Sequence, residues 1–489
     1  MNATVIIVLM ALLVRVILAA GSGLGIDESY MVAATTHFSA SYFEHPLVSW
    51  WLELGARHLF GSSAPLIVRL PFVLLSGVSS WLLYLITKRL FNHRAGFWAV
   101  VAYVISPVFS LAFGTWVLPD GPLDAALFAC LYALIRALGL PDAKPAIRWW
   151  LLAGVFAGLA MLSKYNAGLI LLGIAIAVLL DPVGRQQLFS PWPWLGVCLA
   201  LALASPILIW NIQHHWISFD YQGGRALGLK LRPLMPLTIW GGEALYVLPW
   251  LWVPMIWVMV RSLAAGPKAR TGWLLAWASL LPILLFALFG LWSQARILYH
   301  WATPGYLMLF PLIGDWATRQ RQTVLKAVAW ASAGLLVLAV FLIVALTQLG
   351  LPPELAQHFK GSKSAMLQAV DWTSIGKDLP LGIDAVAAQR WYDAGKIGYA
   401  LRRDGVDTPV TVFGPEAHQF ALTAPASSLL GKTVLVVALP GSPAQTYARF
   451  VADFASLKPG PTLQVVSHGT VLLSLPTFIG TDMQKVPRQ

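Results

Sequence analysis

The sequence predicts a polytopic α-helical membrane protein that carries a small extracytoplasmic α/β domain at its C-terminal end. Of its 489 residues, 58% are hydrophobic and only 11% are charged, and the mean hydropathy is +0.70. Soluble globular domains average about 45–50% apolar residues. Long apolar segments fill the first 350 positions, whereas the remainder has nearly balanced charge and short apolar runs.

About eleven segments are apolar enough to cross the ~30 Å hydrocarbon layer, which takes roughly 20 residues. They cover residues 3–20, 64–87, 95–113, 123–140, 149–162, 167–180, 192–210, 237–260, 273–291, 301–313 and 327–349. The fifth and sixth are short. The first run lacks the small-residue cleavage site of a signal peptide, and further spans follow it, so we expect a retained helix.

Basic residues predict the orientation of these spans. Alternate turns carry clusters of Lys and Arg, among them Lys88, Arg89, Arg94, Arg261, Lys268, Arg319 and Lys326. Cytoplasmic turns are enriched in Lys and Arg, so the N-terminus is expected in the cytoplasm and, after an odd number of spans, residues 350–489 outside it. The formal charge of +12 therefore reflects membrane orientation, and no nucleic-acid partner is expected.

Two domains follow from this pattern. Residues 1–349 form the transmembrane domain, with a first external loop at 21–64, and residues 350–489 form the soluble domain. In the soluble domain we expect strands in 409–413, 433–439 and 462–475 and helices in 393–403 and 443–457. The Gly-Lys-Thr at 431–433 precedes a strand and lacks the upstream glycine of a P-loop. Cys130 and Cys198 lie in apolar segments, which excludes a disulfide framework.

The residues able to do chemistry gather in turns on the external side. The first external loop holds Asp27, Glu28, Glu44 and His45, and its stretches 28–39 and 46–59 have the spacing of interfacial amphipathic helices. The later external turns hold Asp120, Lys164, His214, His215, Arg225, Arg296 and Tyr299. Solvated loop residues, or a lysine that reaches for water, would explain each one singly. Their gathering on one side favours an active site at the membrane surface.

The order of five motifs resembles the GT-C superfamily of membrane glycosyltransferases. The motifs are Asp-Glu-Ser-Tyr (27–30), Tyr-Phe-Glu-His-Pro (42–46), Arg-Leu-Pro (69–71), Pro-Asp-Gly-Pro-Leu (119–123) and Leu-Ser-Lys-Tyr-Asn (162–166). The branch that they resemble contains bacterial relatives of dolichyl-phosphate-mannose protein mannosyltransferases and of the aminoarabinose lipid A transferase. The resemblance covers about the first 310 residues. It implies transfer of a sugar from a polyprenyl-phosphate carrier to a lipid, glycan or protein acceptor outside the cytoplasmic (inner) membrane, usually with inversion.

The resemblance also implies roles for particular residues. Asp27 matches the acidic loop residue that acts as base or positions the acceptor, with Glu28 beside it, and Asp120 matches the second loop aspartate. Lys164 and the pair Arg296 and Tyr299 match groups near the carrier phosphate. Glu44 matches a motif glutamate, and His45 stands where many relatives have lysine, so phosphate binding is expected to rest more on Lys164 and Arg296.

The reaction itself requires the same kinds of side chain, whether or not the resemblance holds. Glycosyl transfer from a lipid phosphate requires a carboxylate to deprotonate the acceptor and cations to take the charge of the leaving phosphate. Arg225 suits that phosphate because a guanidinium pairs bidentately with its oxygens. A divalent metal could supply part of the charge, with Glu44 and either His214 or His215 as ligands.

A transporter or flippase for a lipid-linked sugar is the alternative, because intramembrane charges also mark translocation paths. The candidate charges cluster at one face instead of the midplane. No inverted repeat of broken helices is visible in the sequence, which favours the transferase.

Overall fold

The computed structural model describes residues 3–141, 144–224, 231–293, 297–350, 365–439 and 441–487. Within these ranges, six helices are long and apolar enough to cross a membrane: α1 (Ala3–Gly21), α4 (Pro65–Leu90), α7 (Asp120–Leu138), α11 (Pro191–Gln213), α15 (Arg270–Phe289) and α18 (Gln322–Leu349). Two further pairs of helices pass the same test together, and the number rises to eight if each pair is one broken span. The chain is therefore a polytopic helical protein, as predicted.

Both of these helix pairs are sharply bent. α5 (His93–Ile105) continues into a π-helical turn, Val108–Ala112, and α6 (Phe113–Thr115) after a bend of 80°. α13 (Met235–Val247) and α14 (Pro249–Ala265) meet at 115° around Leu248, whose φ is 91°. Pro107 and Pro249 stand at these breaks, and a proline ends the helix before it because it lacks an N–H and crowds the preceding turn. The sequence pattern did not predict these breaks.

The remaining predicted spans correspond to shorter helices. α8 (Trp149–Ser163) and α9 (Ala167–Leu180) are the two short segments expected, and residues 301–313 divide between α16 (Thr303–Leu307) and α17 (Phe310–Thr318). Short helices α10 (Pro182–Gln187) and α12 (Ile217–Gly224) flank α11. The number of eleven crossings stays a prediction.

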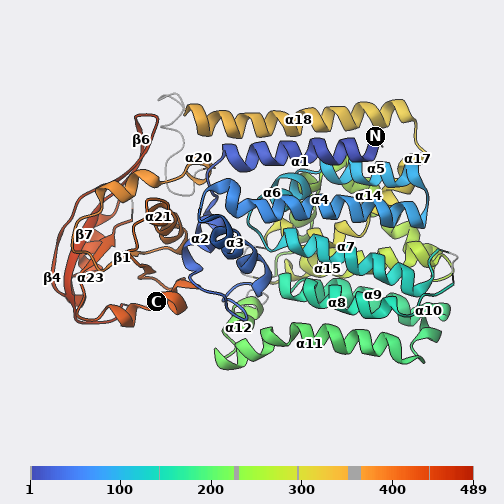
Figure 1. Cartoon of the computed structure of the whole chain (residues 1–489), viewed down its shortest axis with the longest axis horizontal. Coiled ribbons are helices and arrows are strands. Elements are labelled where there is room, and N and C mark those ends of the chain that lie inside the picture. Colours follow the sequence, from blue (N-terminus) through green and yellow to red (C-terminus); the bar gives the residue numbers. More distant parts are fainter. Residues whose placement is uncertain are drawn as a thin grey trace. The chain divides into compact units, whose positions relative to one another are not determined.

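Small residues let the helices approach closely. A Cβ atom built on Gly154 of α8 would lie 2.1 Å from the carbonyl oxygen of Gly196 in α11, and one on Gly173 of α9 would lie 2.2 Å from that of Trp277 in α15. Figure 1 shows α7, α8 and α11 running side by side. Lipid tails are as apolar as leucine, so close backbone packing of this kind drives helix association inside a membrane.

The described chain divides into two compact units. The helical unit comprises Met1–Val16, Ser39–Ser49 and Pro71–Leu338, and the C-terminal unit comprises Ile17–Phe38, Trp50–Leu70 and Ala339–Gln489. The first external loop thus contributes α2 (Ile26–Ala34) and most of α3 (Leu47–Phe60) to the C-terminal unit. The domain boundary at residue 350 stays a prediction.

The C-terminal unit contains a five-stranded mixed sheet of order β2-β1-β3-β7-β4. The strands are β1 (Ala385–Ala388), β2 (Val410–Val412), β3 (Val434–Val437), β4 (Phe454–Pro459) and β7 (Thr477–Met483). β1 is parallel to β2 and β3, whereas β7 is antiparallel to β3 and β4. α21 (Trp391–Arg403) makes the crossover from β1 to β2 that a parallel pair requires. β5 (Leu463–Ser467) and β6 (Thr470–Leu475) form a separate hairpin.

Most expected elements of this domain are present, and one is wrong. The segment 443–457 was expected to be helical throughout, but α23 (Pro443–Phe450) ends early and β4 begins at Phe454. Phe450, Phe454 and Leu457 have helical spacing, yet the last two are buried residues of strand β4. β1 and β7 were not predicted: β1 is four residues of alanine and valine, which carry little strand signal.

The close contact of α8 with α11 makes a testable prediction. Gly154→Ala should lower the thermal unfolding temperature in detergent, because its methyl group has no space and overpacking typically costs about 1–3 kcal/mol. Gly334→Ala in α18, where an added Cβ meets nothing within 4 Å, is the matched control and should be neutral or stabilising. Equal unfolding temperatures for the two variants would contradict this packing.

Candidate active site

The predicted site residues are found in both units. Asp27 and Glu28 belong to the C-terminal unit, and Glu44, His45, Asp120, Lys164, His214, His215 and Tyr299 belong to the helical unit. Arg225 and Arg296 lie outside the described residues.

Asp27 and Glu28 occupy the first turn of α2 and differ in environment. Neighbouring residues on a helix point about 100° apart, so Asp27 is exposed while Glu28 is buried. The Glu28 Oε2 atom accepts a hydrogen bond of 2.8 Å from the Gly25 N–H, one of the donors that the start of a helix leaves without a helical partner. The positive end of the α2 dipole stabilises both carboxylates.

Arg69 holds Glu28 from the start of α4. Its Nε and Nη2 atoms donate to the two Glu28 carboxylate oxygens at 2.8 Å and 2.6 Å. Its Nη1 and Nη2 atoms also donate to the carbonyl oxygens of Ser22 at 2.9 Å and Gly23 at 2.7 Å. The Arg-Leu-Pro motif therefore fixes the segment that leads into α2. Glu28 orients this helix through its contacts with Arg69.

Residues of the C-terminal domain fix the same segment. The buried Lys396 ammonium in α21 donates to the carbonyl oxygen of Leu24, to that of Gln368 at 2.8 Å and to that of Val370 at 3.0 Å. An Asp371 carboxylate oxygen accepts from the Leu24 N–H at 3.0 Å. Burial lowers the Lys396 pKa to about 8, a shift that Asp371 and Glu28 oppose. The sequence analysis did not identify Lys396.

Tyr30 anchors α2 on α21. Its ring makes edge contacts with Trp50, Trp391 and Phe420 at centroid distances of 5.2–5.8 Å, and its hydroxyl oxygen accepts from the Gln419 N–H at 2.8 Å. A Cβ on Gly395 would lie 2.7 Å from the Tyr30 Cα, so only glycine permits this approach. The helix that carries Asp27 is therefore tied to the C-terminal domain by packing and by polar contacts.

In the helical unit, Asp120 and Lys164 form a buried ion pair. Both Asp120 carboxylate oxygens lie 2.8 Å from the Lys164 Nζ atom, and the two residues are 2% and 4% exposed. Asp120 is the first residue of α7, and Lys164 follows the last residue of α8. The α7 dipole favours the carboxylate and the α8 C-terminus favours the ammonium. The pair holds one cation and one carboxylate where two helix ends meet.

Tyr299 belongs to a segment that is hydrogen-bonded to the turn between α8 and α9, the turn that holds Lys164. It begins the 3-10 turn Tyr299–Trp301, whose Trp301 carbonyl accepts a 2.9 Å hydrogen bond from the Asn166 side chain. The Tyr299 ring packs on Gly242 of α13, where a Cβ would come within 2.5 Å of it. The structure thus brings together the Lys-Tyr-Asn motif, Asp120 and the segment of Tyr299.

Glu44, His45 and the two histidines after α11 lie on neighbouring elements. The Glu44 side chain is buried, and its backbone carbonyl accepts from the Gln222 amide at 2.7 Å. The His214 Nδ1 atom lies 2.8 Å from the Trp210 carbonyl oxygen, and its ring stacks on Trp210, whereas His215 is exposed and has a φ of 54°. His214 and His215 therefore differ in environment, as expected for adjacent histidines.

No metal site of three or more ligands is formed among the residues that the structure describes. His214 can offer at most its Nε2 lone pair when Nδ1 donates to Trp210. The fit of Glu44 with a single histidine is therefore incomplete. Metal dependence stays a prediction, and we derive no step through a metal.

Three further polar residues are buried in the helical unit. Asp124 lies inside α7, and its carboxylate accepts from the Tyr103 hydroxyl at 3.3 Å. Arg15 of α1 donates to the Ser110 carbonyl at 3.1 Å and to the Ser76 hydroxyl at 3.0 Å. Glu243 of α13 accepts from the Tyr306 hydroxyl at 2.5 Å. A single charge inside an apolar span is the signal that could have identified Arg15 and Glu243.

Residues 44–210 match the family model described as dolichyl-phosphate-mannose-protein mannosyltransferase. Lipid A galacturonosyltransferase RgtD of Rhizobium johnstonii is 26% identical over 289 residues, 58% of this chain and 58% of the relative. Undecaprenyl phosphate-alpha-4-amino-4-deoxy-L-arabinose arabinosyl transferase 1 of Proteus mirabilis is 25% identical over 275 residues, 53% of this chain and 47% of the relative. The chain thus spans about half the length of the curated relatives it matches.

The fold is similar over the whole chain to a solved structure. The crystal structure of ArnT from Cupriavidus metallidurans bound to undecaprenyl phosphate matches with a TM-score of 0.64 and 16% identity, covering 100% of both chains. Its apo form matches with a TM-score of 0.64 and 15% identity, covering 99% of this chain and 98% of ArnT.

These findings define the kind of protein: the chain is a multi-pass membrane protein, and its resemblance to GT-C glycosyltransferases is confirmed. Over its whole length it has the fold of ArnT.

The buried pair predicts a specific pattern of stability. Asp120→Asn should lower stability by about 3–5 kcal/mol, because it leaves the Lys164 ammonium buried without its countercharge. The double variant Asp120→Asn/Lys164→Met should recover part of that loss, since no charge is then left alone. Thermal unfolding in one detergent checks both. A double variant no more stable than Asp120→Asn would show that the two side chains are not coupled.

Lys396 predicts a pH dependence. Its pKa is about 8 in the folded chain against 10.5 in the unfolded chain, so the unfolded state holds more protons between these values. The wild type should gain stability relative to Lys396→Met as the pH rises from 8 to 10.5, by at most about 1.4 kcal/mol per pH unit. Unfolding temperatures of both proteins across this window test the sign. A difference that stays constant would mean that Lys396 titrates normally.

Proposed function

We propose that this chain is a glycosyltransferase of the bacterial cytoplasmic membrane. It moves a hexosyl or pentosyl group from a polyprenyl-phosphate donor to a lipid, polysaccharide or protein acceptor outside the cytoplasm. The observation that carries this proposal is the buried Asp120–Lys164 pair at the meeting of two helix ends, in a chain with the fold of ArnT. The names of the relatives support it, because they refer to lipid A, to lipopolysaccharide core and to undecaprenyl phosphate-linked sugars.

The proposed reaction is a displacement at the anomeric carbon. The acceptor hydroxyl attacks this carbon, the bond to the phosphate oxygen breaks, and attack from the opposite face inverts the configuration. A carboxylate takes the hydroxyl proton as the new bond forms, which typically contributes about 10²–10⁴-fold in rate. We assign this role to Asp27, which is exposed in the first turn of α2. Arg69 holds this helix through Glu28, and Lys396 holds the segment before it through the Leu24 carbonyl.

The leaving polyprenyl phosphate gains negative charge, and a fixed cation lowers the energy of that state. We assign this cation to Lys164, with Tyr299, Arg225, Arg296 and His45 as further phosphate contacts. Asp120 holds the Lys164 ammonium at a defined position, and Glu28 holds α2. A divalent metal near Glu44 remains part of the proposal, and loss of activity on chelation with recovery on adding the metal would support it.

The proposed topology has eleven crossings, a cytoplasmic N-terminus and an extracytoplasmic C-terminal domain. It places the turns rich in Lys and Arg in the cytoplasm. α3 carries exposed Trp51 and Phe60 and would lie in the headgroup layer.

A flippase for lipid-linked sugars is the second candidate. The two broken helix pairs, bent by 80° and 115°, favour it, because discontinuous helices line the substrate paths of many transporters. Purified protein in detergent separates the two functions. A transferase converts donor and acceptor into glycosylated acceptor and free polyprenyl phosphate, whereas a flippase leaves both unchanged.

Asp27 provides the direct mutational test of the reaction. Asp27→Asn should lower transfer by about 10²–10⁴-fold, because an amide cannot accept the proton. The protein should stay folded, since this side chain is exposed. Glu28→Gln should lower activity together with thermal stability, because it weakens the contact with Arg69. Near-full activity of Asp27→Asn would rule out the mechanism.

Cysteine labelling tests the topology. In a chain without its two native cysteines, Leu381→Cys on the fully exposed surface of the C-terminal domain should react with an impermeant reagent in intact cells. Arg94→Cys, in a turn expected in the cytoplasm, should react only after permeabilisation. The reverse pattern would invert the whole scheme.

A further inference from the structure

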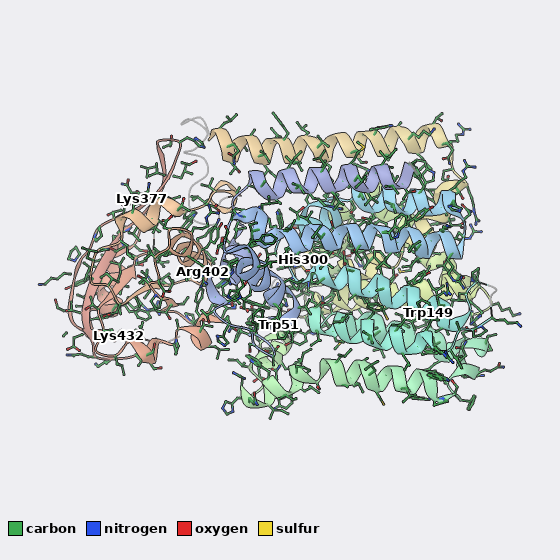
Figure 2. All side chains as sticks on the ribbon, viewed as in Figure 1. Trp51, Trp149, His300, Lys377, Arg402 and Lys432 are labelled. Carbon is green, nitrogen blue, oxygen red and sulfur yellow. The ribbon has the colours of Figure 1, made fainter. Side chains whose placement is uncertain are left out.

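The C-terminal unit contains a polar cavity whose lining residues take no part in the site described above. It has a volume of about 430 Å³, within the range of about 300–1,000 Å³ typical of small-ligand sites. The cavity lies where α3 and α21 end, beside the turn that follows α3. Its wall includes Arg57, His58, Ser62, Ser63, Arg402 and Arg403. Arg402, labelled in Figure 2, lies on α21 beside α3.

Positive charge dominates this cavity. Arg57 pairs with the buried Glu53, at 2.8 Å between Nε and Oε2, and donates to the Thr35 carbonyl at 3.0 Å. Arg402 donates to the Ala33 carbonyl at 3.3 Å, and Arg403 to the Tyr399 hydroxyl at 3.5 Å. These last two contacts involve neutral acceptors. Burial lowers the Arg402 pKa, and the charge of Arg57 lowers it further, while Glu53 and Asp407 oppose the shift.

Helix capping alone does not account for this arrangement. Arg57 and His58 occupy the last turn of α3, and Arg402 and Arg403 the last turn of α21, where cations favourably oppose the helix dipole. That effect explains each pair on its own helix. It does not explain why two such ends meet in one cavity, where the cations repel each other. An anion between them would turn that repulsion into attraction.

The lining matches a phosphate group. Guanidinium groups bind phosphate oxygens through paired N–H donors, and the fixed charge of arginine persists at any physiological pH. The Ser62 hydroxyl oxygen accepts from the Ala64 N–H at 3.2 Å, so its own proton is available to a ligand oxygen. The cavity therefore offers several donors to one anionic group.

Exposed apolar side chains on α3 are close in sequence to the residues that line the cavity. Leu59 and Phe60, which directly precede the turn at residues 61–63, are 78% and 51% exposed. Phe38 and Trp51 are also exposed, and their rings pack at 5.5 Å. Exposed aromatic and aliphatic groups beside a cationic site are typical of a surface that meets the head and the chains of an anionic lipid.

We propose that this cavity binds a phosphate group of the acceptor, a phosphorylated glycolipid whose acyl chains lie along Phe38, Trp51, Leu59 and Phe60. The inference rests on the proposed transferase function and names the part of the acceptor that the enzyme recognises. It predicts that the acceptor is chosen partly by its phosphate, at a distance from the hydroxyl that receives the sugar.

Transfer kinetics test the proposal with the full chain. Arg403→Gln and the double variant Arg402→Gln/Arg403→Gln should raise the acceptor KM about tenfold to a hundredfold and leave kcat and the donor KM close to wild type. Arg449→Gln, an exposed arginine on α23 away from the cavity, is the matched control and should change none of these. With an acceptor whose phosphates have been removed, the acceptor KM of the wild type should rise by the same factor. The KM of the arginine variants should not rise further when the phosphates are removed. An equal KM rise with both acceptors would overturn the proposal.

A binding measurement separates this proposal from the transferase function. Native mass spectrometry of the wild type should show a higher occupancy for the phosphorylated glycolipid than for its dephosphorylated form, and Arg403→Gln should abolish the difference. Preferential binding of the phosphorylated glycolipid without any sugar transfer would contradict the proposed function but support the phosphate site. Transfer with no preference for phosphate would contradict the site alone. If the variants lose binding of an anionic phospholipid but not of the glycolipid, the cavity serves the bilayer and the proposal is wrong.

Discussion

A charge that leaves water needs a countercharge, and this constraint shapes both units. Glu28 with Arg69, Glu53 with Arg57, and Asp120 with Lys164 are buried ion pairs among the described residues. Breaking such a pair by removing one partner typically costs about 3–5 kcal/mol, because the remaining charge stays uncompensated. Glu53 and Arg57 lie on one helix, whereas each of the other two pairs fixes the relative position of the segments that carry it. Asp120 and Lys164 join the ends of α7 and α8, and Glu28 and Arg69 join α2 to α4.

A buried charge also needs hydrogen-bond partners, and this helps to explain why the C-terminal domain belongs to one unit with part of the first external loop. Lys396 has three N–H donors, and backbone carbonyls of Leu24, Gln368 and Val370 accept from it. Tyr30 adds apolar packing around the same helix. The domain thus has a mechanical role as well as any role in recognition: it holds the helix that carries Asp27. A loop that bears a general base gains from such support, because small displacements of a catalytic group cost much of its effect.

The sequence predicts what depends on local composition. The long apolar segments predicted α1, α7 and α18, and the short apolar runs of the C-terminal domain predicted β2 and β3 close to their observed bounds. Asp120 and Lys164 were identified as candidates, but their pairing was not, because 44 positions separate them and only tertiary packing joins them. The breaks after α5 and α13 fall at Pro107 and Pro249, inside segments that are otherwise apolar enough to be read as continuous spans. β4 was taken for helix because Phe450, Phe454 and Leu457 have helical spacing, whereas pairing with β7, which the local pattern does not contain, makes the segment a strand.

The central claim is that the Lys164 ammonium, held by Asp120, meets the carrier phosphate. Affinity for undecaprenyl phosphate is the most direct measure of it, for the wild type, Lys164→Met and the control Lys88→Met in the same detergent. Loss of one charge-assisted contact typically costs about 1.5–3 kcal/mol. Lys164→Met should therefore bind about tenfold to a hundredfold more weakly, while Lys88→Met binds as the wild type does. Equal affinities for the two variants would show that Lys164 is a structural cation and that the phosphate is bound elsewhere.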